Sequence, residues 1–268
     1  LSYFGYDFFV NSPTMFSPPT GMPIPPDYVI GPNDSVRIIL YGNRNATYML
    51  KVTREGEIFF PSIGPISVAG LTFHDCKETI QQIVANQLIG TKATVSMGKL
   101  RTVNIFVLGE ANQPGMYSVD SLTTLTNAIF KSGGVNTTGS LRNIQLKRQG
   151  KVISTFDFYD LLLNGDTSND ARLMPGDVVF IPPISKTIGV TGAVGRQGIY
   201  ELKERETLKD VIKYAGNLKP KADIFSGTLH RIDLTDNGFS LIPVDLTDSS
   251  AENFEIINGD VLSVHSVI

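Results

Sequence analysis

Residues 103–267 contain nearly the same sequence twice, with the two copies 83 positions apart. The segment VLGEANQPGMY at Val107–Tyr117 returns as VTGAVGRQGIY at Val190–Tyr200, and a valine, two glycines and the tyrosine stay in register. About 80 residues can bury a modest core unaided, whereas the unit of a solenoid is shorter and depends on its neighbours. The chain is therefore predicted to contain two tandem copies of one small domain.

The register continues through a helix and a closing turn. Four positions of a threonine-capped helix recur at the same spacing, and they are Thr124/Thr207, Leu125/Leu208, Ile129/Ile212 and Gly133/Gly216. Each copy closes on a Gly-Asp turn and an apolar strand, PGDVVFIP from Pro175 and NGDVLSVH from Asn258. Between helix and turn, FDFYDLL from Phe156 best matches VDLTD from Val244 at an offset of 88 positions. We therefore expect compensating loop insertions in the two copies.

Composition and charge narrow the class of protein. With 41% hydrophobic and 18% charged residues, the chain is typical of globular proteins rather than of disordered chains or coiled coils. The net charge of −3, with lysines and arginines scattered singly, argues against a nucleic-acid partner. No run of about 18 apolar residues is present, so no membrane-spanning helix is predicted. The single cysteine, Cys76, excludes a disulfide framework and a thiolate metal cage, and its place on an apolar helix stripe indicates a core residue.

The residues before the repeat divide into an arm and a folded module. The arm is rich in aromatic residues and proline, and we expect it to be extended and to pack on a neighbour or fray; its prolines are Pro13, Pro18, Pro19, Pro23, Pro25 and Pro26. Its start lacks the basic residues of a signal peptide, so we expect the numbering to begin inside a longer precursor. The predicted organisation is an arm at 1–27, a first module at 28–101, a first copy at 102–184 and a second copy at 185–268.

The sequence pattern of the first module predicts short strands around one helix. A turn at Gly31–Asp34 leads into a strand with Val36, Ile38 and Leu40 on one face, and two short strands are punctuated by Glu55-Gly56 and Gly64-Pro65. The helix should begin after Thr72, stop near Gly90 and bury an apolar stripe made of Phe73, Cys76, Ile80, Ile83 and Val84. Three modules with one threonine-capped helix each favour an α+β fold with mixed sheets over a doubly wound parallel fold.

The motifs of the first module are similar to those of a known family. YVIGPND from Tyr28, together with REGEIFFPSIGPISVAGLT from Arg54, resembles the export domain of the outer-membrane polysaccharide export family. The two copies resemble the soluble-ligand-binding β-grasp (SLBB) modules that follow that domain. Nearly the whole chain from Tyr28 is covered. The residues expected to carry this structural signature are Gly31, Pro32, Asp34, Gly56, Gly109, Pro114, Gly115, Tyr117, Gly133, Gly176, Asp177, Gly192, Gly198, Tyr200, Gly216, Gly259 and Asp260.

The resemblance implies a function without catalysis. It implies the periplasmic portion of a Gram-negative capsule or exopolysaccharide exporter, associated with the outer membrane and forming part of a ring-shaped conduit. The implied partners are the exported polysaccharide, an inner-membrane polysaccharide co-polymerase and further copies of the chain in a ring. No cofactor and no metal are implied. The alternative is a soluble periplasmic glycan- or small-ligand-binding protein, and an envelope hydrolase is disfavoured because no acid-base constellation is visible.

The chain departs from the family pattern at four points. Asn33 replaces a turn glycine, but asparagine tolerates the left-handed backbone that such a turn requires. Asn258 replaces the proline of the second closing turn, which costs stiffness rather than the fold. The lipid-attachment cysteine and the terminal amphipathic helix of many relatives are not found. We therefore expect this segment alone to be monomeric or weakly associated.

Candidate sites have structural explanations that compete with functional ones. His74, His230 and His265 show no metal-ligand spacing. The glycines lack the context of a phosphate-binding loop and are expected at helix ends and turns. The aspartates at 34, 177 and 260 occupy equivalent turns, and because each stands alone in its module, a turn carboxylate accepting a backbone N–H is preferred to a calcium site. Sugar contact remains open for four residues near the shared strand-turn segment, namely Phe106, Tyr117, Arg196 and Tyr200, although a corner tyrosine would recur in the same way.

Overall fold

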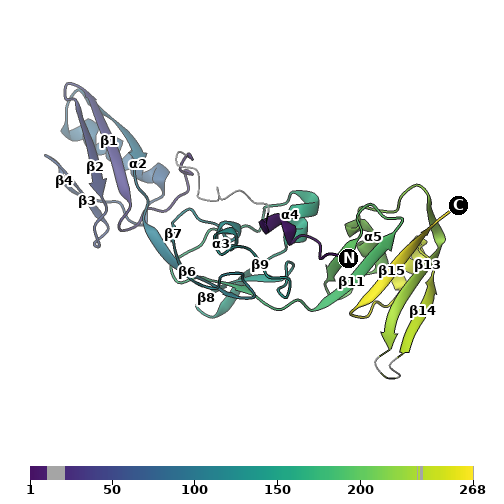
Figure 1. Ribbon diagram of the computed structural model, residues 1–268. Helices are drawn as coiled ribbons and strands as arrows, with labels where there is room; N and C mark the ends of the chain where they lie inside the picture. The colour runs from purple at the N-terminus through teal and green to yellow at the C-terminus, as the bar shows by residue number, and fades with distance from the viewer. Residues whose placement is uncertain (11–21, 234, 236–237, 268) are drawn as a thin grey trace.

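The chain forms an elongated row of three α+β modules in the computed structural model, which describes residues 1–10, 22–233, 235 and 238–267. The first module lies at one end and the second copy at the other, and the N-terminus lies between the two copies (Figure 1). Pro13, Pro18 and Pro19 of the predicted arm lie outside the described residues. In the part of the chain so described, no helix is long and apolar enough to cross a membrane.

The first module packs one helix on short antiparallel sheets. Its elements are β1 (Ser35–Gly42), β2 (Ala46–Lys51), β3 (Glu57–Phe60), β4 (Gly64–Ser67), α2 (Phe73–Gln87) and β5 (Thr91–Met97). The main sheet has the order β2-β1-β5, and β3 pairs with β4 in a separate hairpin. Its apolar side chains form a core cluster of their own.

Most residues predicted for the core of this module are buried, whereas Phe73 and Ile83 of the predicted helix stripe are only partly buried. Val36 and Ile38 are 0% exposed and Leu40 is 2% exposed, so the alternation along β1 faces the core as predicted. The helix α2 begins after Thr72, whose side chain accepts a hydrogen bond from the Asp75 N–H, and it ends at Gln87 shortly before Gly90. Asn33 has φ 75°, which confirms the left-handed turn backbone expected of asparagine at this position.

The two copies share one fold. The first copy contains β6 (Thr102–Gly109), β7 (Gly115–Asp120), α3 (Leu125–Lys131), β8 (Ile144–Arg148), β9 (Lys151–Phe156), α4 (Phe158–Asn164) and β10 (Val178–Ile181). The second contains β11 (Lys186–Gly192), β12 (Gly198–Leu202), α5 (Leu208–Tyr214), β13 (Ala222–Asp233), β14 (Gly238–Val244), α6 (Asp248–Asn253) and β15 (Asp260–Ser266). Their sheets have the orders β7-β6-β10-β8-β9 and β12-β11-β15-β13-β14, which are equivalent strand by strand. The predicted duplication is confirmed, and the fold is α+β.

Both repeat helices begin with the predicted threonine cap. Thr124 and Thr207 each form a capping box, with Asn127 and Asp210 respectively at the third helical position. We expect Thr124→Ala and Thr207→Ala each to lower the free energy of unfolding by about 1 kcal/mol, because the backbone N–H of the third helical residue loses its acceptor. Urea unfolding of each variant measures this loss. Unchanged midpoints in both variants would contradict the shared cap.

The N-terminal segment packs across the two copies. Phe4 and Ile199 are joined by a backbone hydrogen bond of 2.9 Å, and residues 7–10 form the short helix α1 (Asp7–Val10). The hydroxyl of Tyr6 donates to the carbonyl oxygen of Gly139 at 2.5 Å. A helix here differs from the predicted extended arm, because the helical turn lets Phe9 pack against the rings of the first copy. The apolar residues of both copies form one continuous core cluster, separate from that of the first module.

Candidate functional site at the module junctions

The three turn aspartates are buried hydrogen-bond acceptors. Asp34 and Asp177 are 0% exposed and Asp260 is 1% exposed. Each carboxylate accepts the backbone N–H of the residue three positions earlier, which is Gly31, Met174 or Ile257, at 2.8–3.0 Å. The three aspartates are therefore turn residues whose carboxylates accept a backbone N–H, and they occupy equivalent positions because the same turn recurs in each module.

Each turn aspartate is the one carboxylate of its own turn, as expected, and in the two copies it is also paired with an arginine. Arg148 donates from Nε and Nη2 to Asp177 at 2.8 and 2.9 Å, and Arg231 makes the same two bonds to Asp260 at 2.9 and 2.7 Å. A bidentate pair of this kind neutralises a carboxylate that would otherwise be buried as an unpaired charge. Arg148 and Arg231 are also 83 positions apart, so the repeat itself held the signal for these pairs.

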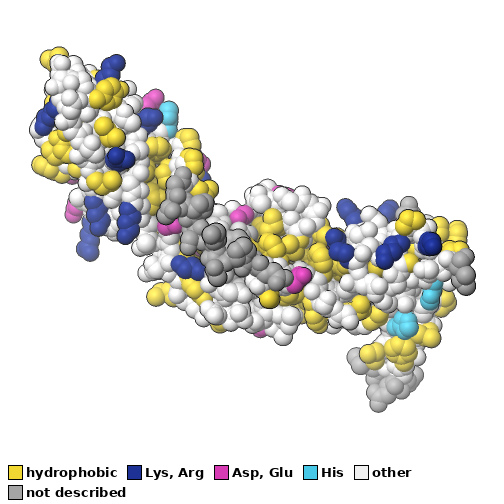
Figure 2. Space-filling model, turned by 45° about the horizontal axis from the view of Figure 1, so that its top comes forward, with side chains coloured by type: hydrophobic (Ala, Val, Ile, Leu, Met, Phe, Trp, Pro, Cys, Tyr) yellow, Lys and Arg dark blue, Asp and Glu magenta, His cyan; other side chains and the backbone are white. Residues whose placement is uncertain are grey.

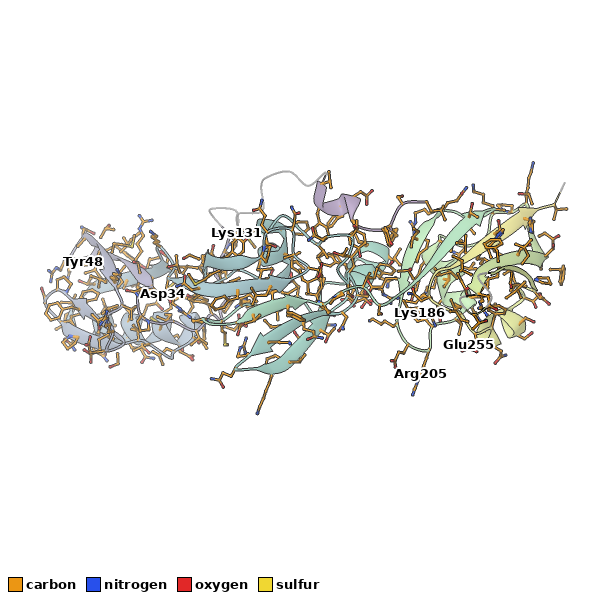
Figure 3. All side chains as sticks on the ribbon, turned by 60° about the horizontal axis from the view of Figure 1, so that its bottom comes forward. Asp34, Tyr48, Lys131, Lys186, Arg205 and Glu255 are labelled. Atoms are coloured by element: carbon orange, nitrogen blue, oxygen red, sulfur yellow. The ribbon has the colours of Figure 1, made fainter. Side chains whose placement is uncertain are left out.

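The junction between the first module and the first copy is built around Asp34 (Figure 3). Arg101, just before β6, donates from its backbone N–H and from Nη1 to the Asp34 carboxylate at 2.7 and 2.6 Å. The Tyr28 hydroxyl lies 2.9 Å from Asp34 and 2.6 Å from the hydroxyl oxygen of Ser121, which follows β7. The turn that starts the first module is thereby bonded to the first copy.

The junction between the two copies is a buried ionic cluster around Arg142, which is 4% exposed. In the first copy, the Arg142 guanidinium contacts the carboxylate of Asp157 at 3.2 Å. In the second copy, it contacts the carboxylate of Glu206 at 2.6 Å and the backbone carbonyl oxygen of Glu201 at 3.1 Å. The guanidinium also lies over the rings of Tyr159 and Tyr214, at 4.5 and 4.9 Å from their centroids. These bonds raise the pKa of Arg142 despite its burial, so it stays charged and ties the two copies together.

Glu201 of the same junction makes the fold sensitive to pH. Burial raises the pKa of the Glu201 carboxyl, although hydrogen bonds from Ser140 and Leu141 act in the opposite direction. Above the ordinary glutamate pKa, the unfolded state has lost the Glu201 proton while the folded state still holds it. The contribution of Glu201 to the stability of the fold therefore falls as pH rises from the ordinary glutamate pKa through the raised pKa of the folded state. We expect Glu201→Gln to gain stability relative to the parent chain between about pH 4 and pH 7. Thermal midpoints across this range measure the difference, and parallel curves would contradict it.

The recurrent tyrosines have a structural role in both copies. The Tyr200 hydroxyl donates to the carbonyl oxygen of Arg196 at 2.8 Å, and the Tyr117 hydroxyl donates to the carbonyl oxygen of Gln113. Both are corner bonds that span four residues of the same turn. Tyr200 is fully buried, whereas Phe106 lies on the outer face of the sheet and is 37% exposed. The structure therefore does not gather the four residues considered for sugar contact into one site.

His74 lies on α2 of the first module, whereas His230 on β13 and His265 on β15 both lie in the second copy. His74 pairs with Glu78 at 3.5 Å on the first turns of α2, and the two side chains are 61% and 59% exposed. Together with Asp75 they form the one group of three metal-capable side chains among the described residues. Exposed acidic groups on one helix face are ordinary, and this group offers two carboxylates and an imidazole nitrogen, whereas calcium takes six or more oxygen ligands.

A small pocket opens at the junction of the two copies. It has a volume of about 260 Å³ and includes the side chains of Arg142, Tyr159, Asn164, Arg196, Lys213 and Tyr214. Arg196 is held there by a bond from Nη2 to the carbonyl oxygen of Tyr214 at 3.0 Å, and its guanidinium lies 5.3 Å from the centroid of Phe4. Aromatic, amide and cationic groups suit a polar ligand more than a chemical reaction, since no nucleophile and base face each other in this pocket.

Comparisons with protein families match all three modules. Residues 22–98 match the model of the polysaccharide biosynthesis/export protein family. Residues 103–181 and 187–237 match models of the SLBB domain. An export domain followed by two SLBB domains is the order that the sequence motifs indicated.

Three curated relatives are polysaccharide transport or export proteins. The chain is 29% identical to the polysialic acid transport protein KpsD of Escherichia coli over 242 residues, which is 89% of the chain and 42% of the relative. It is 32% identical to the EPS I polysaccharide export outer membrane protein EpsA of Ralstonia nicotianae over 63% of the chain and 45% of the relative. It is 28% identical to the capsule polysaccharide export outer membrane protein CtrA of Neisseria meningitidis over 54% of the chain and 37% of the relative. The chain thus spans less than half the length of these relatives, which are transport and export proteins rather than enzymes, as predicted for this chain.

Proposed function

Because the chain belongs to the outer-membrane polysaccharide export family, we propose that it forms the periplasmic portion of a Gram-negative exporter of capsule or exopolysaccharide. In this proposal the export domain and the two SLBB domains build one segment of a ring-shaped conduit. Function is then geometric: the modules set the width of the lumen and dock to an inner-membrane co-polymerase. No bond of the polysaccharide is broken or formed by this chain.

The observation that carries the proposal is the bonding of both junctions. Tyr28, which donates to Asp34 or to Ser121, hydrogen-bonds the export domain to Ser121 of the first SLBB domain, and Arg142 joins the two SLBB domains. A row of modules held by buried hydrogen bonds and ion pairs behaves as a rod of fixed shape, and fixed shape is what head-to-tail repetition around an axis requires. A receptor that closes on its ligand would instead favour a mobile junction.

The outer faces of the two five-stranded sheets offer surfaces for contacts between copies. On the first SLBB domain, Phe106 and Leu108 of β6 and Met116 of β7 are 37%, 38% and 64% exposed. On the second, the paired residues Ile232 and Phe239 are both 63% exposed. Exposed apolar clusters of this kind mark interaction sites, and many small contacts suffice when a ring closes.

The proposal is tested in the source bacterium with the full-length protein. Deletion of the gene should abolish surface polysaccharide, and Met116→Glu should reduce it strongly because every contact between copies would carry the added charge. Ile89→Glu is the matched control, since Ile89 is 87% exposed after α2 and away from both sheets. Normal surface polysaccharide in the deletion strain would refute the proposed function. Equal losses in the two variants, at equal protein levels, would refute the role of the sheet face.

A second candidate function is recognition of a saccharide, and the junction pocket of about 260 Å³ favours it. Arg196 and Lys213 supply positive charge, Asp160 supplies a carboxylate, and Tyr214 forms part of the wall. Titration of the chain with an anionic oligosaccharide, followed by Arg196→Ala, distinguishes the two candidates. A saturable complex lost in the variant would support recognition, and the absence of binding would leave the conduit as the sole function supported.

A further inference from the structure

The groove between α5 and α6 of the second SLBB domain has a counterpart in the first SLBB domain that is already filled by a peptide segment. We propose that the groove of the second domain binds a short acidic, aliphatic segment of another polypeptide chain, in the way that α1 fills the first. The repeat makes the two grooves comparable position by position.

The groove of the first domain is filled by Phe9 of α1. The Phe9 ring centroid lies 5.4 Å from that of Phe130 on α3 and 5.2 Å from that of Phe158 on α4. A Cβ added at Gly134 would lie 2.3 Å from Cγ of Phe9, so the glycine is what makes room for the ring. An aromatic anchor, two aromatic walls and a glycine therefore define this docking mode.

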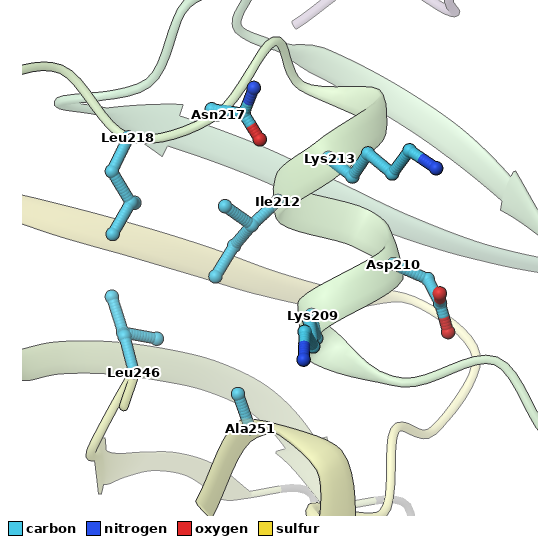
Figure 4. A pocket seen from close by; sticks show the side chains of 8 residues that line it. All are labelled: Lys209, Asp210, Ile212, Lys213, Asn217, Leu218, Leu246 and Ala251. Atoms are coloured by element: carbon cyan, nitrogen blue, oxygen red, sulfur yellow. The ribbon is translucent and has the colours of Figure 1, made fainter. Parts of the chain in front are cut away.

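The groove of the second domain is open. It has a volume of about 540 Å³ and is lined by Lys209, Asp210, Ile212, Lys213, Asn217, Leu218, Leu246 and Ala251. In Figure 4, the apolar side chains of Ile212, Leu218, Leu246 and Ala251 converge between α5 and α6. An apolar floor of this size accommodates a few side chains of a docked segment.

Replacements at equivalent positions define the chemistry of the occupant. Lys213 stands where the first domain has Phe130, and Lys209 stands where it has Thr126. The Lys209 ammonium is paired with the Glu252 carboxylate of α6 at 2.8 Å, so the attraction for a docked carboxylate comes from Lys213. Lysines and arginines also gather over the second SLBB domain in the space-filling view (Figure 2). A segment that carries carboxylates is therefore complementary to the groove.

The floor distinguishes an aliphatic segment from an aromatic one and from a saccharide. Asn217 stands where Gly134 makes room for Phe9, so its side chain takes up space that a ring would need. None of the eight lining residues is aromatic, whereas saccharides are held largely by stacking on ring faces. A leucine-sized side chain next to a carboxylate fits both restrictions.

Two peptides test the proposal on the full chain. The first is the segment of residues 3–10, YFGYDFFV, and the second is the same peptide with Phe8→Glu and Phe9→Leu. With isotope labels on isoleucine and leucine methyl groups, the second peptide should give saturable shifts at Ile212 and Leu218. Lys213→Glu should weaken this binding about tenfold at low salt, since a rim attraction becomes a repulsion. The exposed position of Lys213 leaves the fold intact, which the unchanged methyl spectrum elsewhere verifies.

A converted groove provides the matched comparison. The double variant Lys213→Phe and Asn217→Gly gives the second domain the residues that the first has at these two positions, and it should prefer the unaltered peptide to the acidic one. Equal binding of the acidic peptide to the parent chain and to Lys213→Glu would overturn the proposal. So would a lack of shifts at Ile212 and Leu218 with both peptides, or shifts there with an oligogalacturonate probe alone.

Discussion

Replacement of Arg142 by alanine is expected to lower the free energy of unfolding of the SLBB pair by about 3–5 kcal/mol, because the buried carboxylate of Asp157 and the partly buried carboxylate of Glu206 lose their counter-charge. Asp157 is 6% exposed, and Lys203, which remains 2.6 Å from it, has a side chain that is 47% exposed. Lys203 therefore compensates only part of the loss. Since the SLBB pair has one continuous core and the export domain has another, the chain should unfold in two transitions.

Calorimetry measures this first prediction. Arg142→Ala should lower the midpoint of the SLBB transition by about 10 °C and leave that of the export domain nearly unchanged. Arg172→Ala is the matched control, because its contact with Asp27 is long, at 4.0 Å, and both side chains are well exposed. A shift in Arg142→Ala no larger than in the control would show that the cluster does not hold the two domains together.

Asp34→Ala is expected to destabilise the export domain by about 3 kcal/mol, because several hydrogen-bond donors lose one common acceptor. These donors are the N–H groups of Gly31 and Arg101, the Tyr28 hydroxyl and the Arg101 guanidinium. Burial already raises the pKa of Tyr28, so this hydroxyl cannot ionise to offset the lost charge near neutral pH.

The effect of Asp34→Ala is measured in the calorimetric transition of the export domain. The export-domain midpoint should fall by roughly 15 °C in Asp34→Ala, since a domain of this size loses several degrees per kcal/mol. The midpoint should fall less in Asp34→Asn, because the amide oxygen of asparagine can still accept the hydrogen bond from the Gly31 N–H. Asp27→Ala serves as the exposed control, with an 80% exposed carboxylate. Loss of less than about 1 kcal/mol in Asp34→Ala would refute the assigned role of the turn.

The repeat explains why much of the fold was predictable. Local signals act over a few residues, such as the alternation along β1 of the export domain and the threonine cap that occurs in both copies. The Arg148 and Arg231 pairs recur at the same spacing of 83 residues, so the repeat also carries a signal for them. The helical form of α1 was not predictable, since it depends on the ring of Phe9 finding walls more than a hundred residues away.

The Arg142 cluster could not be read from the sequence. The residue 83 positions after Arg142 is Phe225, so duplication gives no sign that this arginine matters. Its carboxylate partners Asp157 and Glu206 lie 15 and 64 residues away, and chain folding alone brings them together. A charged residue with distant partners looks the same in sequence as a solvated one, because burial is a property of the tertiary structure.

The central claim is that this chain is one rigid segment of a closed export conduit. Electron cryo-microscopy of the full-length protein in detergent tests it most directly. The account predicts rings with an open central lumen, in which the export domain and both SLBB domains of each copy keep the arrangement of Figure 1. Isolated copies without a lumen, or a symmetric dimer that survives dilution, would contradict the claim.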